Sequence, residues 1–449
     1  MPKLGLISLG CSKNLVDSEH MLSRLRAAGW EITDDMAEAD VGVVNTCGFI
    51  ESAKTEAIET ILETARHKQA GKMKGLVVTG CLVQRYADEM REELPEIDVL
   101  CGTGSYENIV DAANAALAGA KAAYMNDMAA AALGGGRERL TPSYTAYLKI
   151  AEGCSNRCAF CIIPKLRGPY RSRQLDALLE EAQALSDAGV QELIVIAQDI
   201  TVYGMDLPAH KRLLPELLRA LCNMRFRWIR LHYLYPDQIT DELIDVIASE
   251  PQIVKYLDIP LQHVSERILR AMHRPGGTAA FTALIEKLRA RIPGLVLRTS
   301  LIVGLPGETE EEFAELCAFL QQMRIERVGV FEFSPEEGTE AAALPGQIDA
   351  AVKQNRRLIV EELQSGVMDE YNIDRHRTEM TVLCEGFDEE QQRYIGRTYA
   401  DSIEVDGHVY FESEQAVQPG EFVTVFITDS FGPDLTGVRK EETTDDDSQ

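Results

Sequence analysis

Short apolar runs alternate with helical segments along most of this chain, and this alternation limits the possible folds more than any other feature. Within residues 1–130 the runs are LGLISLG, VGVVNTC, GLVVTGC and IDVLCGTG, each followed by a segment with helical periodicity. A repeated order of strand and helix predicts a parallel sheet with helices on both faces. We therefore expect an α/β, doubly wound domain over residues 1–130.

Three cysteines follow directly after the last residue of an expected strand. They are Cys11, Cys47 and Cys81, and together they are called the N-terminal triad. One such cysteine would be explained as a small residue in a tight turn. The carboxyl ends of parallel strands share one edge of a sheet, so the three thiols are expected to meet in one metal site. Cys101 ends the fourth run in a similar place, but we do not expect it to be a ligand.

A second strand-and-helix series begins after a glycine-rich linker, AAAALGGGRERLTP. Its apolar runs are TAYLKIAEG, ELIVIAQDI, RWIRLHYLYP, YLDIPLQH, VLRTSLIVGLPG and RVGVFEFSP. Parallel strands in series predict a partial or full (β/α) barrel over residues 140–376, with the active site at the carboxyl ends of its strands. A long polar helix over residues 349–371 is expected to lead away from this barrel.

The last part of the chain changes to short alternating strands. TEMTVLCEG, RYIGRTYAD, GHVYFES and EFVTVFITDS predict a small antiparallel β-barrel over residues 377–443, followed by an acidic tail, 444–449. From Thr378 to the end, 18 acidic residues oppose four basic ones, which is a net charge of −14 out of −27 for the chain. Such a segment has no electrostatic attraction for nucleic acid.

Composition narrows the class of protein. A chain of 449 residues with 45% hydrophobic residues predicts two or three globular domains. It has neither a signal-peptide pattern nor an apolar run of ~20 residues, so we expect a cytoplasmic protein without a membrane span. In a reducing compartment its ten cysteines are more often ligands or small core residues than disulfides. Cys222, Cys317 and Cys384 lie within helix or strand patterns, and we expect them in the core.

The stretch EGCSNRCAFCIIP places three cysteines in eight positions. They are Cys154, Cys158 and Cys161, called the loop triad, and they follow the first expected strand of the barrel. A structural zinc site needs four ligands and disulfides need pairs. Three thiolates hold three irons of a [4Fe–4S] cluster and leave the fourth iron open. The alternative is a zinc knuckle with a distant fourth ligand.

The CxxxCxxC spacing, with Phe160 before the last cysteine, resembles the radical S-adenosylmethionine superfamily. An N-terminal cysteine domain, such a core and a small C-terminal barrel together resemble the methylthiotransferases over essentially the whole chain, the barrel being similar to a TRAM domain. This resemblance implies a second [4Fe–4S] cluster held by the N-terminal triad, and S-adenosylmethionine bound at the open iron of the loop-triad cluster. Cys101 has no counterpart among the family's ligands.

Methylthiotransferases act either on an adenosine in transfer RNA or on the β-carbon of an aspartate in ribosomal protein twelve of the small subunit. This chain is similar to the ribosomal-protein branch in GCSKNLVDSE, NTCGFIESAK, GCLVQRY, CSNRCAFCIIPKLRGPYRSR, AQDITVYG and IPLQHVSERILRAMHRPG. It departs at Ile200, where a threonine is common. The resemblance implies that S-adenosylmethionine supplies both the methyl group and the radical, while the second cluster delivers the sulfur.

The alternatives are a transfer-RNA adenosine methylthiotransferase and a non-catalytic iron–sulfur module that regulates ribosome assembly. The acidic barrel favours a basic ribosomal protein as the partner, with no stable nucleic-acid binding. We also expect a low-potential electron donor and a monomer.

Several polar or glycine positions near the expected strand ends are candidates for contact with S-adenosylmethionine. They are Phe160, Gln198, Asp199, Tyr203, Arg298 and Gly304. A tight turn alone also explains Gly304, which begins GLPGE. His263 and Ser265 are candidates for lining the pocket. A basic run beside the loop triad consists of Lys165, Arg167, Arg171 and Arg173, and its default interpretation is a solvated face, with pairing to an acidic target as the alternative.

Overall fold

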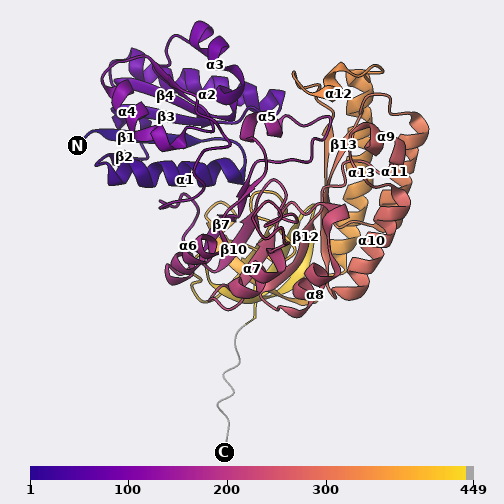
Figure 1. The fold of residues 1–449 in the computed structure, drawn as a ribbon. Coiled ribbons are helices and arrows are strands. Elements are labelled where there is room, and N and C mark those ends of the chain that lie inside the picture. Colours follow the sequence, from indigo (N-terminus) through magenta and orange to yellow (C-terminus); the bar gives the residue numbers. More distant parts are fainter. Residues whose placement is uncertain (441–449) are drawn as a thin grey trace, which may run out of the picture.

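The computed structural model describes residues 1–440 and divides into three parts (Figure 1). An N-terminal part, a central part and a C-terminal barrel follow one another along the chain. The expected acidic tail, 444–449, lies outside the described residues. No helix in residues 1–440 has the length and apolar character needed to cross a membrane.

The N-terminal part is built on six parallel strands in the order β2-β1-β3-β4-β5-β6. Their bounds are β1 (Lys3–Ser8), β2 (Glu31–Thr33), β3 (Val41–Thr46), β4 (Gly75–Gly80), β5 (Val99–Cys101) and β6 (Ala122–Tyr124). The four expected strands are the central ones. The sequence analysis missed β2 and β6, because three-residue edge strands carry no distinct apolar run.

Helices cover both faces of this sheet, which confirms the doubly wound arrangement. They are α1 (Ser12–Ala27), α2 (Glu51–Gln69), α3 (Cys81–Glu93) and α4 (Ile109–Leu117), with short 3-10 turns η1 (Met36–Glu38) and η2 (Tyr106–Asn108). Apolar residues of α1 and α4 pack with Leu4, Val43 and Val77 on one face. Those of α2 and α3 pack with Val44 and Val78 on the other. Neighbouring strand residues therefore point to opposite cores, as the two-residue period of a strand requires.

The linker over residues 129–142 contains no helix or strand, as expected. Arg137 nevertheless anchors it, because the buried guanidinium pairs with Glu19 of α1 and, at 2.8 Å, with Glu181 of the central part. The linker therefore holds the N-terminal and central parts together through one shared cation.

The central part contains a parallel sheet in the order β14-β13-β12-β11-β10-β7. The strands are β7 (Thr145–Lys149), β10 (Glu192–Ile196), β11 (Trp228–Leu231), β12 (Ile253–Asp258), β13 (Val296–Val303) and β14 (Arg327–Glu332). All six expected strands are present. Because β7 and β14 are the two edges, the sheet is open, which agrees with a partial barrel. A short antiparallel pair, β8 (Ala151–Glu152) and β9 (Arg171–Ser172), brackets the loop triad.

Helices pack on one face of this sheet, and with it they form the largest core. They are α6 (Leu175–Asp187), α7 (Leu214–Leu221), α8 (Asp241–Ser249), α9 (Glu266–Ala271), α10 (Thr278–Arg291), α11 (Glu310–Met323) and α13 (Ala350–Ile373). The short elements α5 (Ile163–Arg167), α12 (Glu340–Ala343) and the 3-10 turn η3 (Pro236–Gln238) do not belong to this core, and α5 lies beside the N-terminal part (Figure 1). The long polar helix expected over residues 349–371 is α13.

Five strands close the C-terminal barrel, in the order β15-β16-β17-β19-β18. They are β15 (Glu379–Asp388), β16 (Arg393–Arg397), β17 (Val409–Glu412), β18 (Phe422–Phe431) and β19 (Asp434–Arg439). The sequence analysis missed β19. Pairing is antiparallel except between β17 and β19, which run parallel. We expected an antiparallel barrel, and the pairing of β17 with β19 departs from that expectation.

The C-terminal barrel covers the face of the central sheet that the helices leave open. Leu383 and Ala400 of the barrel pack with Trp228, Tyr256 and Val296 of the sheet. The loop between β16 and β17 extends further, and Ile403 reaches Val16 of α1. One apolar cluster thus contains residues from all three parts of the chain.

Candidate active site

The N-terminal triad lies at the carboxyl edge of the first sheet. Cys11 precedes α1, Cys47 follows β3, and Cys81 is the first residue of α3. A Cβ atom on Gly10 would lie 2.7 Å from Cβ of Cys47, and one on Gly48 would lie 3.1 Å from the carbonyl carbon of Cys81. Both glycines therefore permit the close approach of the three loops. The structure brings the three cysteines of this triad together.

Burial differs among these thiols. Cys11 is exposed, Cys47 is half-buried and Cys81 is buried. Burial raises the pKa of the Cys81 thiol to about 12, and burial also raises the pKa of Cys47. Such thiols stay protonated near neutral pH unless a metal displaces the proton.

Cys101 stays apart from this triad. It is buried, and its thiol donates to the carbonyl oxygen of Ser105 at 3.1 Å. A structural role accounts for it. Cys384 is buried in the barrel core as expected, whereas Cys222 and Cys317 are only half-buried at the edge of the central core.

The loop triad lies between β8 and α5, at the carboxyl end of the first central strand. Cys154 and Cys158 are buried and Cys161 is half-buried. Gly153 has φ +78°, and a Cβ there would lie 2.2 Å from the carbonyl oxygen of Pro169. The loop is closed by two backbone bonds, from Cys154 N–H to Gly168 O and from Cys161 N–H to Cys158 O. Only glycine fits where the chain enters this loop.

The loop-triad thiols influence one another. Burial, followed by the neighbouring cysteines, raises the pKa of Cys154 to about 11 and that of Cys161 to about 12. Phe160 packs at the edge of an apolar cluster that includes Ala159 and Met272. This apolar wall limits the access of water to the loop.

A single ion has no ready site in the part of the chain that the structure describes, because no three His, Cys, Asp or Glu side chains converge on one point. A [4Fe–4S] cluster makes a different demand, since each thiolate binds a different iron and the sulfurs do not converge. Two groups of three cysteines on rigid strand-end loops fit that demand. Zinc, which requires four convergent ligands, fits it poorly.

The segment after the loop triad contacts the N-terminal triad across the boundary between the N-terminal and central parts. Cys81 packs against Ile162, which follows Cys161 directly, and against Leu166 of α5. The Nε of Arg167 donates to Sγ of Cys81 at 3.3 Å. A residue of α5 thus contacts a ligand candidate of the other part.

Arg167 belongs to a buried ionic network that the sequence analysis missed. Its guanidinium pairs with Asp17 and Glu152 and donates to Asn14, while Lys149 pairs with Glu152 at 2.8 Å. Burial raises the pKa of Glu152, but Lys149 and Arg167 outweigh burial and hold that pKa well below its ordinary value. The network joins α1 to the strand that leads into the loop triad. Its only sequence signal was the position of Glu152, two residues before Cys154.

The interpretation of the basic run as a solvated face was wrong for two of its four members. Arg167 and Arg173 are buried in ion pairs, Arg173 with Glu181. Arg171 is half-buried. Lys165 is exposed, and its ammonium donates to the carbonyl oxygen of Gly338. Asp17, Glu152 and Glu181 on neighbouring elements, which pattern analysis does not reveal, neutralise Arg167 and Arg173.

Three cofactor candidates follow β10. Gln198 donates to Glu152 at 2.8 Å, and its own Oε1 is buried without a partner. Asp199 accepts from Asn156 of the triad loop at 3.0 Å, and burial raises the pKa of this carboxyl group. Tyr203 is fully buried, and its hydroxyl donates to the carbonyl oxygen of Arg173. Gln198 and Asp199 therefore border the loop triad, whereas Tyr203 supports it from the core.

Arg298 and Gly304 lie on and after β13. Arg298 pairs with Asp258 at 3.2 Å and lies 3.9 Å from Asp406 of the C-terminal barrel. Gly304 has φ +73°, and a Cβ there would lie 2.3 Å from Cγ of Lys353. The Glu308 carboxylate accepts from the Gly304 and Leu305 amides, so GLPGE forms a closed turn.

His263 and Ser265 are buried beside α9. The Ser265 amide donates to Nδ1 of His263 at 3.0 Å, and the Ser265 hydroxyl caps α9. Burial lowers the pKa of His263 to about 4, so its imidazole is neutral near pH 7. Local structure accounts for both residues.

Three family models match this chain. The model described as "Uncharacterized protein family UPF0004" matches residues 3–102, the radical SAM superfamily matches 148–320, and the TRAM domain matches 378–439. Among solved structures, the radical S-adenosylmethionine methyltransferase TsrM from Kitasatospora setae aligns with TM-score 0.53 and 16% identity, over 76% of this chain and 77% of that one. OxsB, a cobalamin-dependent radical enzyme, aligns with TM-score 0.51 and 12% identity, over 82% and 56%. These similarities concern the fold alone.

Curated relatives extend over nearly the whole chain. "Ribosomal protein uS12 methylthiotransferase RimO" of Lachnoclostridium phytofermentans is 48% identical over 437 residues, which is 97% of this chain and 99% of the relative. The protein of the same name from Anaeromyxobacter sp. (strain Fw109-5) is 50% identical over 434 residues, 96% of this chain and 92% of the relative. With all three domains matched and both cysteine triads assembled, the chain belongs to the RimO family of radical SAM methylthiotransferases.

Proposed function

We propose that this protein methylthiolates ribosomal protein uS12, at the β-carbon of an aspartate. The observation that carries the proposal is the contact between the segment that follows the loop triad and the N-terminal triad, with Arg167 and Ile162 against Cys81. A reaction that joins a sulfur group to a carbon radical requires both sites to face one substrate. The near full-length relatives named for uS12 support this substrate.

Membership of the radical SAM superfamily implies a [4Fe–4S] cluster and S-adenosylmethionine. We propose the loop triad as the ligands of this cluster, which supplies an electron for reductive cleavage of S-adenosylmethionine. The chain itself supplies a closed loop, an apolar wall at Phe160, and Gln198 and Asp199 beside the loop. We propose these three residues, with Tyr203, Arg298 and Gly304, as the S-adenosylmethionine region, Tyr203 acting by support from the core.

We propose that the N-terminal triad holds a second [4Fe–4S] cluster, from which sulfur is delivered. The match to the UPF0004 model over residues 3–102 is consistent with it. Exposed Cys11 leaves one side of this site open, while buried Cys81 is fixed by Arg167. The exposed side of the site therefore admits a substrate. The buried side holds the N-terminal part against the central part.

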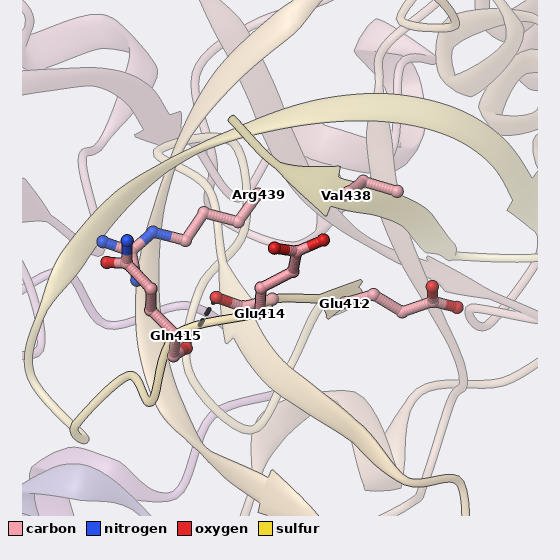
Figure 2. Close-up of a pocket in the computed structure, with 6 residues that line it drawn as sticks. Glu412, Glu414, Gln415, Val438 and Arg439 are labelled. Carbon is pink, nitrogen blue, oxygen red and sulfur yellow. Dashed lines mark hydrogen bonds between the residues drawn. The ribbon is translucent and has the colours of Figure 1, made fainter. Parts of the chain in front are cut away.

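The C-terminal barrel supplies an acidic surface for docking. Its exposed acidic residues are Glu379, Glu389, Glu390, Glu404, Glu412, Glu414, Glu421 and Asp429. Among Lys and Arg within residues 378–440, Lys440 is exposed and pairs with Glu379 at 2.6 Å, Arg393 and Arg439 are half-buried, and Arg397 is buried. A hollow of about 330 Å³ on this barrel is lined by Glu412, Ser413, Glu414, Gln415, Val438 and Arg439. Figure 2 shows the side chains of this hollow as sticks. A basic protein surface complements this charge, whereas a phosphate backbone is repelled.

The acidic barrel also argues against the transfer-RNA alternative and against stable nucleic-acid binding, because phosphate contacts depend on Lys and Arg. We further propose a low-potential electron donor and a monomeric enzyme. A cytoplasmic location follows from the proposed ribosomal-protein substrate.

The test is an anaerobic reaction of the purified, iron-loaded protein with S-adenosylmethionine and dithionite. It is offered uS12 in one arm and transfer RNA in another, and both products are examined by mass spectrometry. The expected result is one methylthio group in place of a hydrogen on a uS12 aspartate, and no change in transfer RNA. Modified adenosine together with unmodified uS12 would reverse the assignment. The loop-triad alanine variant serves as the control and should leave both substrates unchanged.

A further inference from the structure

Arg274 is a buried cation directly beside the loop triad. It lies in the segment after α9, and the residue is 5% exposed. Nη1 lies 3.7 Å from Sγ of Cys158, and Nη2 donates to the carbonyl oxygen of Pro260 at 2.7 Å. The guanidinium lies over the ring of Tyr235, whose hydroxyl is 3.3 Å from the same sulfur. Nε of Arg274 is buried without a hydrogen-bond partner.

The charge of Arg274 is not balanced by the protein. No carboxylate within residues 1–440 lies at ion-pair distance from it, whereas Arg167 beside the other triad is neutralised by Asp17 and Glu152. A buried charge without a counter-charge is costly, so its presence requires an anion. Three thiolates outweigh the charge of a [4Fe–4S]²⁺ core, so a cluster held by the loop triad is that anion.

We propose that Arg274 is a positioning residue that serves as the built-in counter-charge of the loop-triad cluster, holding the Cys158 ligand and raising the reduction potential of the cluster. This inference rests on the cluster assignment made under the proposed function. Hydrogen bonds to the sulfurs and the net charge of the surroundings set the potential of such clusters. A fixed cation favours the reduced state because reduction adds one negative charge. Tyr235 adds a neutral hydrogen bond to the same sulfur.

The test uses protein in which the N-terminal triad is replaced by alanine, so that one cluster remains. Dithionite with mediators supplies one electron to convert [4Fe–4S]²⁺ to [4Fe–4S]⁺, and electron paramagnetic resonance measures the reduced fraction at each set potential. Arg274→Met should lower the ratio of reduced to oxidised cluster about tenfold at a given potential, a fall in midpoint of about 59 mV for one electron. Arg274→Lys should recover most of this fall, and Tyr235→Phe should show a smaller one.

Arg270→Met is the matched control, because it removes the same charge from an exposed side chain four residues earlier. It should leave the midpoint unchanged. An unchanged midpoint in an iron-loaded Arg274→Met protein would overturn the inference, as would an equal fall in the Arg270→Met control. Absence of iron from the starting variant itself would instead refute the loop-triad cluster.

A second measurement tests the contact between Arg274 and the cluster if Arg274→Met does not retain its cluster. The starting variant is expressed in cells supplied with arginine that carries ¹⁵N in the guanidinium alone, and hyperfine spectra of its reduced cluster are recorded. A ¹⁵N coupling that disappears in Arg274→Lys is expected. A spectrum without that coupling contradicts the inference.

Discussion

Replacing Arg397 by methionine should loosen the C-terminal barrel from the central sheet. Glu192, at the start of β10, accepts from Arg397 at 2.7 Å and from Arg230 at 2.9 Å, and all three side chains are fully buried. The second contact of Arg397 is Glu385 of β15, at 2.8 Å. The methionine keeps part of the apolar stem but leaves Glu192 with one cation and Glu385 without its arginine partner.

Removal of one partner from a buried ion pair costs about 3–5 kcal/mol, because the other charge stays buried. Arg393→Met on the same strand is the matched control. Arg393 pairs with Glu412 at the surface, so its loss costs about 0–1 kcal/mol. The difference of about 3 kcal/mol corresponds to a roughly hundredfold larger opened population of the barrel.

Hydrogen exchange of the β15 and β16 amides measures this opening, because exchange under native conditions reports local unfolding free energies. Arg397→Met should exchange these amides roughly a hundredfold faster than Arg393→Met. Exchange rates within a factor of about three of each other would refute the idea that this ionic cluster holds the barrel in place.

Four further outcomes are expected. Alanine at all three loop-triad positions should leave about half of the iron, because the N-terminal triad forms a separate site; full retention, or complete loss from folded protein, would contradict two sites. Alanine at the N-terminal triad should still allow release of 5′-deoxyadenosine with dithionite but no methylthio transfer, and full transfer would exclude the second cluster from the reaction. Gly153→Ala should lose the iron of the loop triad, because the new Cβ would collide with the carbonyl oxygen of Pro169. Gly189→Ala is the control, since Gly189 also has a positive φ, +86°, but open space around it; iron counts should show that this variant keeps its iron. Burial lowers the pKa of His263 to about 4, so its contribution to the free energy of unfolding should be complete above pH 6.5 and lost as the pH falls toward 4. The free energy of unfolding of His263→Gln should therefore depend less on pH in that window.

Much of the fold followed from local pattern. Strands that are buried on both faces appear as short, largely apolar runs, such as VGVVNT and GLVVTG, and these runs alternate with helical segments. All six strands of the central sheet were expected for the same reason. Edge strands β2 and β6, and β19 of the barrel, were missed, because their pairing depends on neighbours and not on an apolar run of their own.

The sequence by itself determined which cysteines could meet, because strand ends in a parallel sheet share an edge and a short loop keeps its cysteines close. Only the tertiary structure decided that Arg167, in the helix after the loop triad, contacts Cys81 of the N-terminal triad. It also decided that Arg274 carries an unpaired charge at Cys158 and that Arg397 reaches Glu192. The physical reason is that these contacts join residues 86 to 205 positions apart, brought together by packing and not by local pattern.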